Sequence, residues 1–154
     1  MQDHIGYDAI IESAMRDVVF KVLKKAENGL TGGHHFVVTY STKYFGVVMS
    51  EYLKQKFPSE ITIVIQHQYQ SLMALENCFK IRLSFSGVME SLTIPYKSII
   101  SFSDPSVNFG LKFNVDDSDE GIIEEQNQEQ LNSENLSGKV VSLADFRKNR
   151  DNKN

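Results

Sequence analysis

The sequence has no tryptophan, one cysteine, three prolines and no long apolar run. The lone Cys78 excludes an internal disulfide and favours a reducing compartment. No apolar stretch approaches the roughly twenty residues that a membrane-spanning helix needs. The first residues, which include Asp3, His4 and Gly6, lack the apolar core of a signal peptide. We therefore expect a cytoplasmic protein.

Motifs typical of enzymes and metal sites are also missing. His34, His35 and His67 have no cysteine at ligand spacing, and no His-Glu-x-x-His sequence is present. Surface or structural histidines are therefore the favoured interpretation. Cys78 has no catalytic signature around it, which favours an inert thiol over a nucleophile. We expect no enzymatic activity, no metal and no cofactor.

Charge is distributed unevenly along the chain. Residues 1–115 carry eleven basic and ten acidic side chains, residues 116–138 carry eight acidic and no basic ones, and residues 139–154 carry five basic and two acidic ones. The acidic stretch offers too little apolar surface to offset the entropy lost on ordering. The near-neutral first part argues against a nucleic-acid surface, which needs clustered Lys and Arg. We predict a folded body (1–115), a disordered acidic linker (116–138) and a C-terminal docking peptide (139–154).

The first segment of the body predicts an amphipathic helix. Asp8 is the expected N-cap, and Gly29 is expected just after the helix ends. The apolar residues that recur at helical spacing are Ala9, Ile10, Ile11, Ala14, Met15, Val18, Val19, Val22, Leu23 and Ala26. This stripe is wide enough to cover the body and leave apolar surface for a second chain. The solvent-facing side is expected to carry Arg16, Lys21, Lys24 and Lys25.

Short β-rich segments follow the helix. The predicted strands are 35–41, 47–49, 61–69, 79–85, 91–95, 99–102 and 107–113. A short helix is expected at 50–57, before Pro58. Many short strands with turn signals between them predict a mainly β fold with an N-terminal helix, either a small β-sandwich or a partly open barrel.

A polar cluster directly follows the strongest predicted strand. Gln66 and Gln68 would share one face of a continuous strand, while His67 and Tyr69 would share the other. Glutamine offers both donors and an acceptor, which suits recognition of the backbone of an extended peptide. The same pattern fits polar residues at the wet end of a strand, and taken alone it favours that plainer interpretation.

Several of these segments resemble one known family. Residues 61–69, 83–88, 92–96 and 103–111 are similar, in this order, to stringent starvation protein B in its alphaproteobacterial form. Residues 139–148 resemble the protease-docking module of the same family. The resemblance covers nearly the whole body and the tail. It implies an Sm-like β-fold and a homodimer.

The resemblance also implies a function. Members of the family bind ssrA-tagged polypeptides and deliver them to the ClpXP protease by tethering to the N-terminal domain of the ClpX unfoldase. The tag-binding residues it implies are Gln66, His67, Gln68, Phe85, Ser86 and Gly87. The implied unfoldase-docking residues are Val140, Val141, Leu143, Phe146, Arg147 and Lys148.

Two further expectations concern assembly and the alternative function. Ala14 and Val18 are compact enough for close helix approach, so we expect them at the dimer interface. The alternative function is an Sm-like RNA-binding module. That function would need a basic, aromatic surface, which the charge balance of residues 1–115 disfavours.

Overall fold

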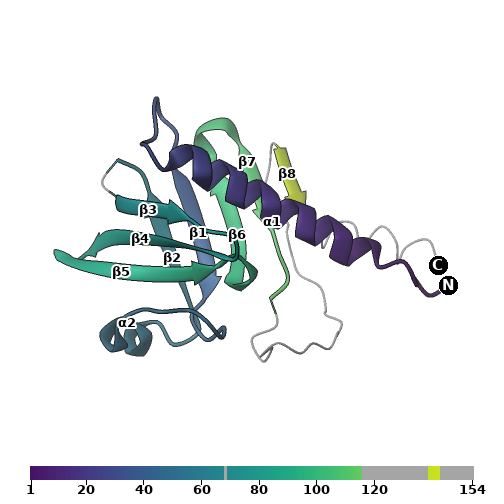
Figure 1. Ribbon diagram of the computed structural model, residues 1–154, viewed down its shortest axis with the longest axis horizontal. Coiled ribbons are helices and arrows are strands. Elements are labelled where there is room, and N and C mark those ends of the chain that lie inside the picture. The colour runs from purple at the N-terminus through teal and green to yellow at the C-terminus, as the bar shows by residue number, and fades with distance from the viewer. Residues whose placement is uncertain (68, 116–138, 143–154) are drawn as a thin grey trace.

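The computed structural model of this chain describes residues 1–67 and 69–115, together with the backbone of one strand at Lys139–Ser142 (Figure 1). In chain order the elements are α1 (Tyr7–Ala26), β1 (Phe36–Ser41), α2 (Glu51–Lys56), β2 (Glu60–Ile65), β3 (Gln70–Ala74), β4 (Cys78–Phe85), β5 (Val88–Pro95), η1 (Tyr96–Ser98), β6 (Ile99–Asp104), η2 (Pro105–Val107), β7 (Phe109–Lys112) and β8 (Lys139–Ser142).

The described strands form two open sheets. One sheet has the order β2-β1-β6-β7-β8, and the other has the order β3-β4-β5. Neighbouring strands are antiparallel except for β7 and β8, which run parallel. An isolated bridge between Val48 and Thr93 joins the segment after β1 to β5. The predicted mainly β fold with an N-terminal helix is confirmed, and its sheets are open.

Alternation along the strands builds the core between the sheets. In β2 the residues Ile61, Ile63 and Ile65 are buried while their neighbours are exposed. β4 repeats this pattern, with Phe79 and Ile81 almost fully buried. Each such side chain contributes about 1.5–3 kcal/mol through removal of its apolar surface from water. The predicted alternation in these two strands is therefore confirmed.

Helix α1 contributes one row of side chains to the same core. Met15, Val19, Leu23 and Ala26 are buried, and the helix contacts β3 and η1. Figure 1 shows α1 lying across the sheets with its N-terminal half projecting beyond them. The C-terminal half of α1 is therefore a core element, and its N-terminal half has a largely exposed surface.

The start of α1 differs from the prediction. The helix begins at Tyr7, and Gly6 occupies the N-cap position. The carboxylate of Asp3 accepts hydrogen bonds from the backbone N–H groups of Ile5, Gly6 and Tyr7 at 2.9–3.0 Å. Asp3 therefore satisfies the amide of the first helical residue and those of the two residues before it, and Asp8 lies inside the helix and not at its N-cap.

Two predicted strands also need correction. Residues 47–49 do not form a strand, because Val48 alone makes a bridge. The strand predicted at 61–69 ends at Ile65, whose pairing partner Phe36 is the first residue of β1. The predicted short helix is confirmed as α2, where the Ser50 hydroxyl accepts a hydrogen bond from the N–H of Leu53 at 3.2 Å.

Candidate functional site

The implied tag-binding glutamine lies in a turn and not on a strand. Because β2 ends at Ile65, Gln66 and His67 fall in the connection between β2 and β3, where both are exposed. The prediction assumed one continuous strand through residues 61–69, and that strand is wrong beyond Ile65. Gln68 lies outside the described residues. The amide of Gln66 is presented from the junction of the two sheets.

Tyr69 anchors this turn to the end of α1. Its hydroxyl donates a hydrogen bond to the carbonyl oxygen of Ala26 at 2.7 Å, and its ring packs against the core. Partial burial raises the pKa of Tyr69, so the phenol stays protonated as a donor. The anchor fixes where the turn leaves the body while Gln66 and His67 face solvent.

The second implied segment is the tight hairpin between β4 and β5. Phe85 ends β4, is partly buried and packs against the core. Ser86 and Gly87 form a two-residue turn with φ of 52° and 84°, the left-handed pair that a type I′ hairpin requires. A Cβ at Gly87 would meet nothing within 4 Å, so glycine is needed here for its backbone conformation, and the space beside it is open.

Strand register brings these two segments to one end of the three-stranded sheet. Gln70, the first residue of β3, pairs with Arg82 near the end of β4. The turn before β3 and the hairpin after β4 therefore lie at the same end of the sheet. Val88, which is 57% exposed, and the exposed Met89 start β5 beside the hairpin and add apolar surface there. We call this region the turn end.

Two sheet edges also meet at the turn end. β2 is the outer strand of one sheet and β3 is the outer strand of the other. Within the described part of the chain, neither strand has a second neighbour. An edge strand presents backbone donors and acceptors that an extended peptide can pair with. The sequence pattern did not reveal these edges, because strand order depends on pairing between distant segments.

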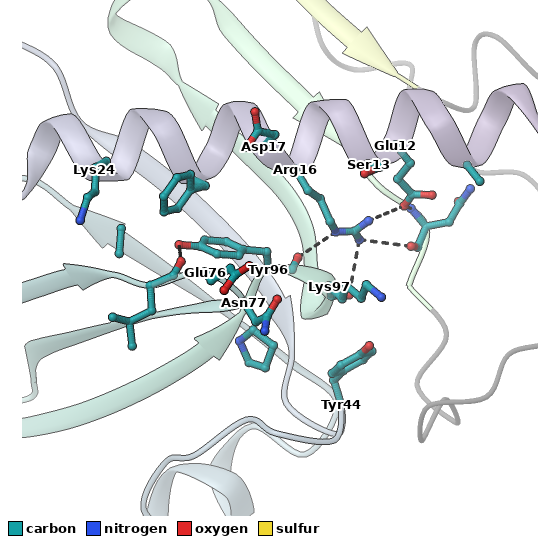
Figure 2. A pocket seen from close by; sticks show the side chains of 16 residues that line it. Glu12, Ser13, Arg16, Asp17, Lys24, Tyr44, Glu76, Asn77, Tyr96 and Lys97 are labelled. Carbon is teal, nitrogen blue, oxygen red and sulfur yellow. Dashed lines mark hydrogen bonds and ion pairs between the residues drawn. The ribbon is translucent and has the colours of Figure 1, made fainter.

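A cleft of about 1140 Å³ lies at the opposite end of the three-stranded sheet, beside α1 (Figure 2). Phe20, Leu75 and Tyr96 supply apolar lining, while Lys24 and Glu76 are among the charged lining residues. None of the implied tag-binding residues lines this cleft. This cleft is therefore separate from the turn end.

Arg16 lies in the wall of this cleft and is largely buried. Its side chain is only 13% exposed, so the prediction that it belongs to the solvent-facing side of the helix is wrong. Nε donates to the carbonyl oxygen of Tyr96 at 2.9 Å, and Nη1 pairs with the Glu12 carboxylate at 2.8 Å (Figure 2). Nη2 lies 3.3–3.4 Å from the carbonyl oxygens of Lys97, Ile99 and Asn114.

This ion pair fastens the end of the body to α1. The Glu12 carboxylate also accepts a hydrogen bond from the backbone N–H of Asn114 at 3.1 Å. The Arg16 guanidinium stacks over the Phe113 ring at 4.5 Å from its centroid. Burial lowers the pKa of Arg16, and the adjacent Glu12 opposes that shift. The chain therefore leaves β7 at a point held by α1.

The expected dimer residues lie on the free face of α1. Ala14 is exposed, and Val18 is 39% exposed. Tyr7 and Ile10 continue the same row toward the N-terminus, and both are exposed. Together these four residues form an apolar row at helical spacing, on a side of the helix that does not pack on the core.

The expected docking residues are described only in part. Val140 and Val141 belong to β8, whose backbone pairs with β7. Leu143, Phe146, Arg147 and Lys148 lie outside the described residues. The pairing of β8 with the body was not predicted, since nothing in the local pattern indicates a parallel partner so far away in the sequence.

His34 takes part in a structural contact with β6. Its Nδ1 lies 2.7 Å from a carboxylate oxygen of Asp104, which also accepts hydrogen bonds from the hydroxyl and N–H of Ser106. Burial alone would raise the pKa of Asp104, but these hydrogen bonds and that from the N–H of His35 lower it overall. In the described part of the chain, no group of three His, Cys, Asp or Glu residues is arranged to hold a metal.

None of the described helices is long and apolar enough to cross a membrane.

Comparison with known proteins identifies the family. A search of curated proteins finds no match. Comparison with protein families matches residues 9–154 to SspB, stringent starvation protein B. The match spans the helix, both sheets, the turn end and the tail. The chain therefore belongs to the stringent starvation protein B family.

Proposed function

We propose that this chain is a cytoplasmic adaptor that binds ssrA-tagged polypeptides and delivers them to the ClpXP protease, in the manner of the alphaproteobacterial form of its family. The observation that carries the proposal is the family match over residues 9–154. Members of the family act as non-catalytic adaptors for ssrA-tagged substrates. The protein accelerates degradation by bringing two partners together.

The proposal divides the work among three segments. Residues 1–115 hold the tag, residues 116–138 act as a tether, and residues 139–154 dock on the N-terminal domain of ClpX. In the docking peptide Val140, Val141, Leu143 and Phe146 supply apolar contacts, and Arg147 and Lys148 supply positive charge at the rim. Tethering makes the second encounter intramolecular, at effective concentrations of up to about millimolar.

The turn end is the proposed site for the tag. The exposed amide of Gln66, the partly buried ring of Phe85 and the open space beside Gly87 lie at one end of the three-stranded sheet. Strand β2 ends there and strand β3 begins there, and each is the outer strand of its sheet. An extended peptide can pair with an open strand edge, and the exposed apolar side chains of Val88 and Met89 offer contact surface for its side chains. His67, Gln68 and Ser86 complete the proposed set.

Substitution of Gln66 tests this site. In Gln66→Ala the backbone groups of the bound tag that the amide satisfies are left unmatched, which should cost roughly 1–3 kcal/mol, or about five- to 150-fold in affinity. The fold should be unchanged, because Gln66 is exposed and lies outside the core. Fluorescence anisotropy with a labelled ssrA peptide measures the change.

The matched control is Gln55→Ala. Gln55 is an exposed glutamine on α2 and belongs to neither of the turns that form the turn end, so its removal should leave tag affinity unchanged. Equal affinities for wild type and Gln66→Ala would contradict the assignment to the turn end. The tag would then have to bind elsewhere on the body, and the cleft beside α1 would be the next surface to test.

The dimer is tested on the free face of α1. We propose that the apolar row of Tyr7, Ile10, Ala14 and Val18 meets the same row of a second copy. In Val18→Asp a charge would be buried at this contact, so we expect a soluble monomer at micromolar concentration by light scattering.

The control for the dimer test is a substitution of the same charge on the cleft side of the helix, away from the apolar row. Ser13 is exposed and lines the cleft, so Ser13→Asp should remain dimeric. A wild-type chain that scatters as a monomer at micromolar concentration would contradict the dimer. A Val18→Asp variant that stays dimeric would place the interface on another surface.

A further inference from the structure

The outer edge of β7 carries a strand from the tail. β8 runs parallel to β7, with Phe109 opposite Lys139, Gly110 opposite Val140, Leu111 opposite Val141 and Lys112 opposite Ser142. Figure 1 shows β8 beside β7, at the end of the larger sheet away from β2. These tail residues overlap the segment proposed to dock on the unfoldase.

The backbone of β7 explains how the edge can take a strand. The N–H of Phe113 donates to the carbonyl oxygen of Ile100 at 2.8 Å, so this residue faces β6. Backbone groups alternate in direction along a strand. The N–H and C=O groups of Leu111 and Phe109 therefore also face β6, in register with Phe102 and Asp104. Those of Gly110 and Lys112 face the opposite side, where β8 lies.

We propose that the outer edge of β7 is a self-docking site for residues 139–142, and that it competes with the unfoldase for them. This inference rests on the proposed function of the tail. One backbone segment cannot pair with β7 and lie in a partner's groove at the same time. The adaptor therefore holds part of its own docking peptide on the body until the unfoldase displaces it.

The chain between the two strands is long enough for this arrangement. Parallel neighbours need a connection of about a dozen residues or more, and residues 113–138 exceed that length. Residues 113–115 belong to the body, and a flexible chain as long as residues 116–138 has ends roughly 26 Å apart on average, which corresponds to an effective concentration on the order of millimolar. A four-residue pairing is weak, so the tail exchanges between bound and free. The apparent Kd for a partner equals the intrinsic Kd divided by the fraction of tails that are not paired with β7.

A proline on β7 tests the proposal without altering the docking peptide. Lys112→Pro removes the N–H that faces β8 and leaves the N–H groups that face β6 in place. Proline is tolerated on an edge strand when its nitrogen faces away from the partner. We expect the full-length variant to bind the ClpX N-terminal domain about two- to tenfold more tightly than wild type. Its affinity should approach that of an isolated 139–154 peptide.

Lys112→Ala is the matched control. It removes the same side chain but keeps the N–H, so its affinity should equal that of wild type. Equal affinities for wild type, Lys112→Pro and the isolated peptide would overturn the self-docking site. A peptide that does not bind the ClpX domain at all would overturn the docking function instead, which is a distinguishable result.

Amide hydrogen exchange provides a readout that needs no unfoldase. In the wild-type chain alone, N–H groups within 139–142 should exchange more slowly than in a free 139–154 peptide. Lys112→Pro should remove this protection while the amides of β6 and β1 stay protected, which also confirms that the body is folded. Exchange in the wild-type tail as fast as in the free peptide would overturn the proposal, whatever the variants do.

Discussion

Deletion of residues 139–154 should abolish adaptor-dependent delivery to ClpXP while the body remains folded and binds the tag as before. In the part of the chain whose side chains the structure describes, the buried core residues lie between Met15 and Phe113, so the deletion removes none of these. The deletion takes away β8 and leaves β7 as an exposed edge of only four residues. Without the docking peptide, the gain in effective concentration that tethering supplies is lost.

The measurement is the degradation rate of a fluorescent ssrA-tagged protein by ClpXP at substrate concentrations below KM. Fluorescence anisotropy with the tag peptide checks that the body still binds. Deletion of residues 149–154 alone is the control, because it keeps every proposed docking residue and should preserve delivery. A chain lacking 139–154 that still accelerates degradation would contradict the role of the tail.

Arg16→Met should lower the free energy of unfolding by about 3–5 kcal/mol, because it breaks a buried ion pair and leaves the other charge uncompensated. The loss would leave Glu12 without its cation and would remove the guanidinium donor from the carbonyl oxygens of Tyr96 and Ile99. Typical domains have only about 5–15 kcal/mol of stability in total. The variant should therefore be markedly less stable.

Urea denaturation followed by circular dichroism measures this change. Lys21→Met is the matched control, because Lys21 pairs with Asp17 at the surface and is 70% exposed. Its effect should stay within about 0.5 kcal/mol. The double variant Glu12→Gln/Arg16→Met should cost less than the sum of the single changes, since the two residues share one contact. A loss below about 1 kcal/mol in Arg16→Met would contradict the structural role.

Features set by local chemistry could be predicted from the sequence. Pro58 beyond the last turn predicted where α2 stops, and alternation predicted the buried faces of β2 and β4. These signals depend only on residues a few positions apart. For the same reason the implied tag residues Phe85, Ser86 and Gly87 could be assigned to a strand end and its turn.

Features that depend on distant partners could not be predicted. The last residue of β2, Ile65, pairs with the first residue of its antiparallel neighbour β1, so no partner remains for a longer β2. Gln66 therefore lies in a turn, although its local sequence continues the strand pattern. Arg16 matches a solvent-facing position by its chemistry, and only the carbonyl groups of η1 and the end of β7 make it an interior residue. The pairing of β8 with β7 joins segments separated by the whole acidic stretch.

The attachment of Asn114 to α1 has a consequence for valency. Glu12 and Arg16 hold the last residues of the body against the helix that we propose as the two-fold seam. In such a dimer each tail departs on the cleft side of its own α1, so the two departure points lie on the two helices that meet at the seam. One dimer could then bind a multi-subunit partner through two docking peptides, and it would dissociate only when both peptides are unbound at the same time. The contact of Asn114 with Glu12 and Arg16 would thus fix where both proposed docking peptides begin, and two such peptides would lengthen the stay on the proposed partner.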